Sequence, residues 1–303
     1  MNISVIIPVY NGRKYLKDCL DSIGSQTLLP DEVIVIDDAS IDPPDNIVAI
    51  YAAITGYPKI RLLKLAVNQG QAAARNMGII HSISDWIAFL DHDDIWDPDH
   101  LAEQKKTAIA TNADLVFCQA KLFQGDPTTG FIRYAIPKLY NDELLEPLAL
   151  MKNNFIITSS CLVRKSAMKD VGLFDTSPDM RNVEDLDMFI KMKLKNMKFA
   201  MSSQASLNYR KHDLSATGRL GHMIRNIVHV TEKHIKTIEG NRSLKNRLRC
   251  DIAWNAANET FYLKNNDRWF WLARAIYLTI IKLKRLDLYI HRFIKFQHKE
   301  FIQ

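Results

Sequence analysis

The chain has 303 residues, of which 47% are hydrophobic and 24% are charged, and its net charge is +6. This is ordinary globular composition, and the length fits one large domain or two smaller ones. The four cysteines include no CxxC pair, which favours buried free thiols in a reducing compartment. No basic and then apolar leader is present, and the apolar stretch 269–281 is too short to span a bilayer. A secreted or membrane-spanning protein is therefore not expected.

Apolar runs alternate with helical spacing through the first half of the chain. The predicted strands are Ser4–Pro8, Val33–Asp37, Ile60–Leu65, Trp86–Leu90 and Leu115–Cys118. The predicted helices between them are Arg13–Gly24, Asn46–Thr55, Ala72–His81 and His100–Thr111. This alternation is typical of an α/β fold in which helices cover both faces of a mostly parallel sheet. Residues 119–160 are less regular, and a strand at 160–163 and a helix at 183–195 are predicted beyond them.

The densest group of acids, Asp91-His92-Asp93-Asp94, directly follows the predicted strand 86–90. Carboxylates packed at a strand end repel one another, and a divalent cation completed by phosphate oxygens offsets that repulsion. Ligands of α/β sheets also collect at the carboxyl ends of the strands. The sequence therefore predicts a metal and an anionic substrate at this edge.

Three other segments carry polar residues after predicted strands or at a helix start. Residues 5–12 (VIIPVYNG) can meet a nucleotide base or form an ordinary turn. The acids in 35–42 (VIDDASID) can accept hydrogen bonds from a ribose or cap a turn. In 68–78 (NQGQAAARNMG), Gly70 permits a close turn, and Arg75 can pair with a carboxylate or phosphate or belong to a plain amphipathic helix.

Together with NVEDLDMF at 182–189, these motifs resemble those of the family-2 glycosyltransferases over roughly residues 1–215. The resemblance implies the Rossmann-like GT-A fold, with a catalytic domain at 1–218. Its nucleotide-sugar half would span about 1–118 and its acceptor half about 119–218. It also implies a nucleotide-sugar donor, usually a UDP-sugar, and Mn²⁺ or Mg²⁺ as cofactor.

Roles in donor binding follow from the same resemblance. Pro8, Tyr10 and Asn11 would line the base and ribose pocket, and Asp38 would face the uracil or ribose. Gly70 would belong to the donor-binding loop.

The acidic cluster matches the DxD motif of the family. Asp93 would ligate the metal most directly, and Asp91 would contact the ribose or a metal-bound water, which makes both candidate metal residues. Arg75 would organise the acids and the diphosphate side, whereas His92 takes the variable middle position. His212 is a candidate third metal ligand, or else a structural surface histidine.

The catalytic base implied by the resemblance is Asp185, at a helix start where the dipole favours an anion. Glu184 would help to orient the acceptor, and Arg210 with Lys211 would close over the diphosphate. A single base opposite the leaving group implies inversion at the anomeric carbon. Charge at a helix N-terminus is the plainer interpretation of the same residues.

Residues 219–303 form a predicted basic helical region with 17 Lys and Arg against 7 Asp and Glu, an excess of ten positive charges. Its basic and aromatic helices would either lie on an anionic membrane surface, or pack on the core or form a homodimer. The first alternative suits a lipid-linked or other glycan acceptor and a cytoplasmic protein peripheral to the inner face of the membrane.

Two other functions use the same features. A nucleotidyl or sugar-phosphate transferase would share the acidic cluster, but the first loop, 10–14, lacks the expected glycine-rich phosphate loop. A non-catalytic nucleotide-sugar binder would have no need of Asp185 at a helix start. A nucleic-acid partner is not expected, although the basic C-terminal region permits one.

Overall fold

The structure, a computed structural model, describes residues 1–134, 136, 142–152, 154–212, 220–238, 242–262, 271–272 and 274–275. These residues form two compact units. Unit 1 comprises residues 1–145 and 155–215, and unit 2 comprises 146–154 with the described residues from 220 onward.

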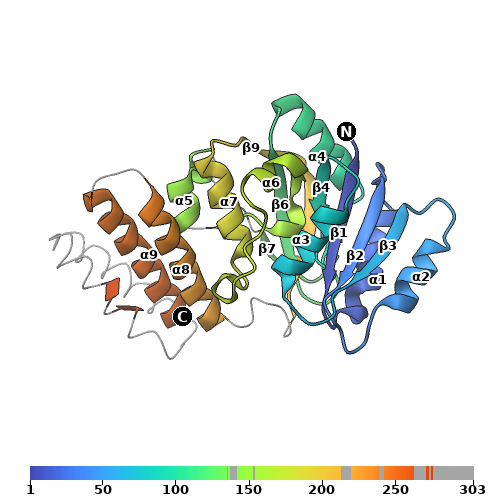
Figure 1. Cartoon of the computed structure of the whole chain (residues 1–303), viewed down its shortest axis with the longest axis horizontal. Helices are drawn as coiled ribbons and strands as arrows, with labels where there is room; N and C mark the ends of the chain where they lie inside the picture. The colour runs from blue at the N-terminus through green and yellow to red at the C-terminus, as the bar shows by residue number, and fades with distance from the viewer. Residues whose placement is uncertain are drawn as a thin grey trace. The chain divides into compact units, whose positions relative to one another are not determined.

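The first half of unit 1 alternates strands and helices as the sequence predicts (Figure 1). Its elements are β1 Ile3–Val9, α1 Arg13–Gly24, β2 Glu32–Asp37, α2 Asp45–Ala52, β3 Lys59–Lys64, α3 Gln71–His81, β4 Trp86–Phe89, β5 Ile95–Trp96 and α4 His100–Thr111. Helix α2 ends three residues before the predicted position, because the chain turns there and Gly56 takes a φ of 84°. The short strand β5 was not predicted.

The second half of unit 1 is built from shorter elements. They are β6 Leu115–Phe123, β7 Phe131–Tyr134, the 3₁₀ turns η1 Asp142–Leu145, η2 Thr158–Ser160 and η3 Pro178–Met180, β8 Leu162–Arg164, α6 Lys165–Asp170, α7 Glu184–Leu194 and β9 Phe199–Arg210. Strand β6 continues five residues past its predicted end, since it pairs with β9 beyond an irregularity at 118–119. The segment predicted as a strand at 160–163 starts inside η2, so β8 begins two residues later.

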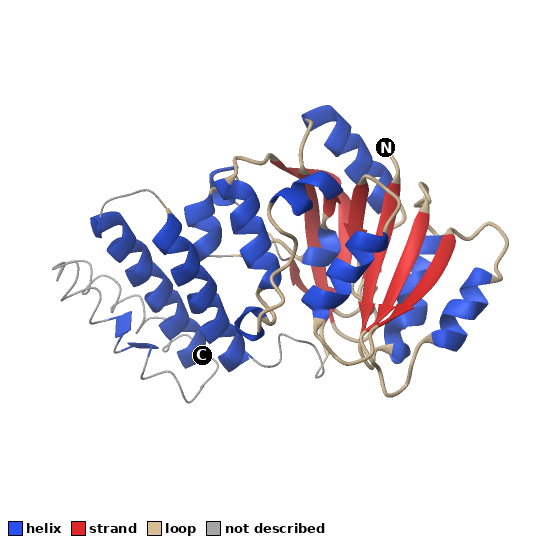
Figure 2. Ribbon diagram, viewed as in Figure 1, coloured by secondary structure: helices blue, strands red, loops and turns tan. Residues whose placement is uncertain are grey.

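The strands, drawn red in Figure 2, join in one sheet. Their order is β3-β2-β1-β4-β8-β6-β9-β5, and β7 pairs with β6. Strands β3, β2, β1 and β4 are parallel to one another. Beyond β4, only the pairing of β6 with β9 is parallel. The α/β class with flanking helices is confirmed, and the parallel part of the sheet consists of β3, β2, β1 and β4.

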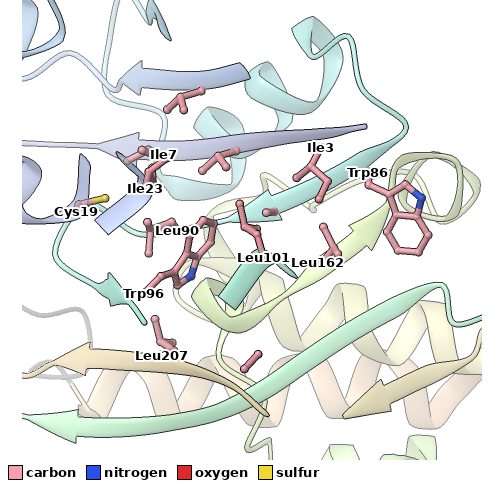
Figure 3. Packing of buried hydrophobic residues seen from close by; sticks show 14 of the residues in the cluster. Ile3, Ile7, Cys19, Ile23, Trp86, Leu90, Trp96, Leu101, Leu162 and Leu207 are labelled. Atoms are coloured by element: carbon pink, nitrogen blue, oxygen red, sulfur yellow. The ribbon is translucent and has the colours of Figure 1, made fainter. Parts of the chain in front are cut away.

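Alternate residues of β1 face opposite sides of the sheet. Ile3 and Ile7 pack in the large cluster with Cys19 and Ile23 of α1 and Leu101 of α4 (Figure 3). On the other face, a Cβ added to Gly78 of α3 would lie 2.7 Å from the Ile6 side chain. Helix α3 therefore lies very close to β1 and β2, because the same Cβ would lie 2.9 Å from the Ile36 side chain.

Unit 2 contains α5 Pro147–Lys152, α8 Leu220–Thr237 and α9 Arg242–Tyr262. Cys250, Trp254 and Trp271 pack in a core of its own. The buried free thiols expected from the sequence are confirmed for all four cysteines. In the described parts of the chain, no helix combines the length and apolar character needed to cross a membrane.

Candidate functional site

The polar loops of the parallel half-sheet meet at one edge. Strand β1 lies between β2 and β4, with Val9 opposite Asp37 and Ile6 opposite Phe89. Because parallel neighbours end on the same side, the loops after β1, β2 and β4 are adjacent. The acids at 91–94 therefore lie beside the loops that contain Asn11 and Asp38.

Asp38 is buried and binds the loop that leads into α3. Its two carboxylate oxygens accept hydrogen bonds from the backbone N–H groups of Gln69 at 2.7 Å and Gly70 at 2.8 Å, and from the Asn68 side chain at 3.0 Å. Burial raises the pKa of Asp38, and the two backbone N–H groups act against that rise. Its observed contacts shape the loop before α3, in which Gly70 has a φ of 89°.

The loop after β1 is fixed to the loop after β2. The Asn11 backbone N–H donates to the Ser40 hydroxyl, and the Asn11 side-chain oxygen accepts from the Ile41 N–H, both at 2.9 Å. Asn11 has a φ of 52°, a conformation that Asn tolerates better than most residues. Tyr10 beside it is 48% exposed, so its ring is open to solvent and can meet a ligand. Pro8 is buried and contributes its carbonyl oxygen, 3.2 Å from His92 Nδ1.

Arg75 is the centre of the acidic site. It projects from the second turn of α3, is only 2% exposed, and donates to Asp91 at 2.7 Å and to Glu184 at 2.8 Å. A weaker bond of 3.3 Å joins it to Gln71 one turn earlier. Burial lowers the pKa of Arg75, but the two carboxylates raise it by more, so the guanidinium stays charged.

Glu184 and Asp185 open helix α7, where the dipole favours negative charge. Burial raises the pKa of both carboxyl groups, and the Arg75 charge acts against the rise in each. The Asp185 carboxylate accepts a hydrogen bond of 3.2 Å from the Thr158 hydroxyl and one of 2.7 Å from the Leu186 N–H. Its position is therefore fixed by residues on two elements.

Asp93, in the acidic loop, contacts His212, which follows β9. His212 Nε2 is 2.8 Å from Asp93 Oδ2, and both side chains are less than a fifth exposed. Among the described residues, no group of three or more His, Cys, Asp and Glu is placed to hold a metal. Two protein donors still suit Mn²⁺ or Mg²⁺, because these ions keep waters and take phosphate oxygens from substrates. Asp91 is less available as a direct ligand, since one of its oxygens binds Arg75.

Arg210 does not lie open to a ligand, because its side chain is largely buried in contacts of its own. It donates to the Asp93 carbonyl oxygen and to the Asp18 carboxylate, both at 2.9 Å, and its backbone N–H donates to Asp94 at 3.0 Å. Its guanidinium also packs over the ring of Tyr15, 4.9 Å from the centroid. Arg210 thus fixes the backbone of the acidic loop.

Several residues of the site were not selected from the sequence. Asp94 is completely buried, and burial raises its pKa well above the usual range. Asp18, Thr158 and Ser159 each bond to a member of the site, and Tyr15 packs against His212 at 4.7 Å between ring centroids. Asp18 and Tyr15 repeat on one face of the first helix, but only the fold shows that this face meets the end of β9.

Acids fixed at the carboxyl ends of the strands of a Rossmann-like sheet lie where the ligands of α/β folds bind. Residues 4–172 match the model of Glycosyl transferase family 2. Since that match covers more than half of the chain, the protein belongs to this family and is a glycosyltransferase that uses a nucleotide-sugar donor.

Two curated relatives from Bacillus subtilis agree with this assignment. The uncharacterized glycosyltransferase YwdF is 28% identical over 191 residues, covering 63% of this chain and 68% of its own. The putative teichuronic acid biosynthesis glycosyltransferase TuaG is 29% identical over 210 residues, covering 69% and 78%.

Solved structures support the fold. The crystal structure of S. aureus TarS 1-349 in complex with UDP-GlcNAc is similar with a TM-score of 0.68 at 18% identity. The similarity covers 92% of this chain and 81% of that one. The GT-A fold expected from the sequence is therefore confirmed.

Proposed function

We propose that this chain is an inverting glycosyltransferase that moves a sugar from a UDP-sugar to a hydroxyl group of a cell-envelope glycan or a lipid-linked acceptor. The observation that carries the proposal is the position of Asp185. Its carboxylate is fixed at the start of α7, and Arg75 joins its neighbour Glu184 to Asp91 of the acidic loop. A candidate base is thus connected to the donor-side acids through one buried arginine.

Each residue then has a separate chemical task. Asp185 accepts the proton of the acceptor hydroxyl, a contribution of about 10²–10⁴-fold for a well-placed general base. Because this base works from the face opposite the leaving diphosphate, the reaction inverts the anomeric carbon. Asp93 and His212 would hold Mn²⁺ or Mg²⁺, which stabilises the charge that develops on the diphosphate.

On the donor side, Tyr10 would lie against the uracil ring of the nucleotide. The loops containing Asn11 and Asp38 would form the wall of the site for the ribose and the uracil. Support comes from the bonds that fix these loops to each other and to the start of α3. UDP is the favoured nucleotide because the similar TarS structures are described as complexes with UDP and UDP-GlcNAc.

Two variants test the chemistry. Asp185→Asn keeps the shape of the side chain but cannot take a proton, so transfer should fall by about 10²–10⁴-fold while UDP binding stays near normal. Asp93→Ala should instead weaken nucleotide binding measured with Mn²⁺. Transfer that survives in Asp185→Asn would remove the assignment of the base, and with it the argument for inversion.

The donor is tested by thermal shift with UDP, GDP, dTDP and CMP, each with and without Mn²⁺. The nucleotide that binds the folded protein raises its melting temperature by mass action. A shift with UDP that is larger in Mn²⁺ supports the proposal. UDP-sugar hydrolysis without acceptor separates an enzyme from a pure binder, and the release of UDP rather than UMP separates it from a sugar-phosphate transferase.

The acceptor side is proposed to meet an anionic surface through α8 and α9. These two helices carry seven Lys and Arg against three Asp and Glu, and Lys236, Arg242 and Arg247 are exposed. Trp254 and Trp271 are buried, so charge, rather than the described aromatic rings, would drive the association. Co-sedimentation with vesicles should therefore require anionic lipid and be lost at high salt. Binding to neutral vesicles alone would contradict this proposal.

A further inference from the structure

The turn η2, Thr158–Ser159–Ser160, lies between the two halves of the proposed chemistry. All three residues are at least 96% buried. We propose that Thr158 and Ser159 are positioning residues that hold the catalytic base and the donor-side acids in fixed relation to each other. The inference rests on the proposed role of Asp185 and extends it to residues that contact no reacting atom.

The sheet explains why this turn reaches the acids. Strands β4 and β8 are antiparallel neighbours, with Ala88 opposite Leu162. The segment that precedes β8 therefore lies beside the segment that follows β4. This places η2 against the acidic loop, although Asp91 and Ser159 are 68 positions apart along the chain.

Each of the two hydroxyl groups serves a different side of the site. The Thr158 hydroxyl donates to the Asp185 carboxylate at 3.2 Å. The Ser159 hydroxyl accepts the backbone N–H of Asp91, the first acid of the acidic loop, at 3.0 Å. Two adjacent side chains thus point to the base and to the donor-side acids respectively.

Buried side-chain donors on two other elements bind the backbone carbonyl groups of η2. The Trp96 indole N–H donates to the Ser159 carbonyl at 2.8 Å, and the Gln104 amide donates to the Ser160 carbonyl at 2.7 Å. Trp96 is stacked on His100, whose ring lies 2.9 Å from the same Gln104 amide. Since β5 and α4 both fix the backbone of η2, its hydroxyl groups have little freedom to follow a displaced carboxylate.

The hydrogen bond from Thr158 should also set the acidity of the base. A donor to the ionised form of a carboxyl group favours that form, so removing it raises the pKa. The other groups that act on Asp185 are Arg75 on α3, the Leu186 backbone N–H, Asp91 after β4 and Glu184 beside it. The buried Cys161 thiol is kept neutral by its raised pKa. None of these is changed by a substitution at Thr158.

The test compares the pH profiles of kcat/KM for Thr158→Val, Thr158→Ser and the wild type. Valine keeps the shape but lacks the hydroxyl, so the acid limb should move to higher pH. At pH values where the base is mostly protonated, the kcat/KM of Thr158→Val should be about tenfold lower than that of the wild type. The loss of one charge-assisted hydrogen bond is large enough to produce this difference. Thr158→Ser keeps the donor and should restore the wild-type profile.

Ser159→Ala and Ser160→Ala complete the design. Ser159→Ala should raise the KM for the donor and leave the acid limb in place, because the hydroxyl that it removes bonds to the acidic loop at Asp91. Ser160→Ala is the matched control, since its hydroxyl bonds within the turn to the Ile157 carbonyl. It should keep both the limb and the donor KM.

The melting temperature of each variant shows whether a loss of activity comes from unfolding or from a displaced carboxylate in a folded protein. If Thr158→Val is folded and its limb coincides with that of the wild type, the positioning role is overturned. The same holds if Thr158→Val does not fold and Thr158→Ser shows a displaced limb. A failure of the proposed function gives a different result. In that case Asp185→Asn would keep its transfer activity, whether or not the substitutions at Thr158 move the pH profile.

Discussion

The buried arginine at the centre of the site gives the sharpest prediction about stability. Arg75→Met keeps much of the apolar stem but removes the charge that faces Asp91 and Glu184. Both ion pairs are short, at 2.7 and 2.8 Å, and Glu184 is almost as buried as Arg75. Removing one partner of a buried ion pair leaves the other charge buried without a partner, and this lowers the unfolding free energy by about 3–5 kcal/mol.

The matched control is Arg13→Met. Arg13 also contacts a carboxylate, Asp42, at 2.7 Å, but the two side chains are 39% and 64% exposed. Exposed pairs contribute about 0–1 kcal/mol because water and salt screen them. Since the distances are equal, the difference between the two variants measures the effect of burial.

The effect of Arg75→Met should depend on pH, with a sign that follows from Glu184. Burial already raises the pKa of Glu184 from 4.5 to about 7 in the presence of Arg75, and removing the cation raises it further. A raised carboxyl pKa in the folded state makes stability fall as pH rises above the unfolded value. In the variant this fall continues above pH 7, so its deficit should be larger at pH 8 than at pH 5.

The assay is urea unfolding of the three proteins at pH 5, 7 and 8, followed by circular dichroism. Because the chain has two compact units, variants are compared within the same transition. An Arg75→Met deficit as small as that of Arg13→Met would refute the reasoning. A deficit that does not grow with pH would refute the electrostatic part of it.

Three further outcomes are expected. Gly78→Ala should lower the unfolding free energy by about 1–3 kcal/mol in urea, because its Cβ would lie 2.7 Å from the Ile6 side chain in a packed core. Gly12→Ala should raise the donor KM, since its Cβ would lie 2.0 Å from the His92 ring, and adding His92→Ala should restore it. The acid limb of kcat/KM should lie above the usual range of an aspartate, because burial raises the pKa of Asp185 and activity is lost as that group protonates.

Much of the parallel half of the sheet could be predicted from the sequence, because its signals are local. Apolar runs and helical spacing place β1 to β4 within a residue or two, and parallel order brings their carboxyl ends to one edge. The position of Arg75 four residues after Gln71 is likewise a matter of helical spacing. The pairing of Arg75 with Asp91 could therefore be predicted, because it involves only α3 and the loop after β4.

The rest of the site depends on pairings that no local pattern reveals. Strand β8 has three residues, and its antiparallel place beside β4 decides that Thr158 and Ser159 reach the acids. Arg210 and Asp18 are 192 positions apart, yet they form an ion pair of 2.9 Å. Arg210 was expected to face the diphosphate, but its bonds to the acidic loop show that its strongest contacts lie within the protein.

The distribution of charge in the site explains why two of its acids suit catalysis. Arg75 pairs with Asp91 and Glu184, and Arg210 uses its side-chain charge on Asp18. Among the described residues, no arginine or lysine forms an ion pair with Asp93 or Asp185. Arg75 acts on Asp185 without a direct ion pair and His212 contacts Asp93, so each carboxylate is neutralised only in part. That remaining charge is what a cation at Asp93 and a proton at Asp185 would neutralise during transfer.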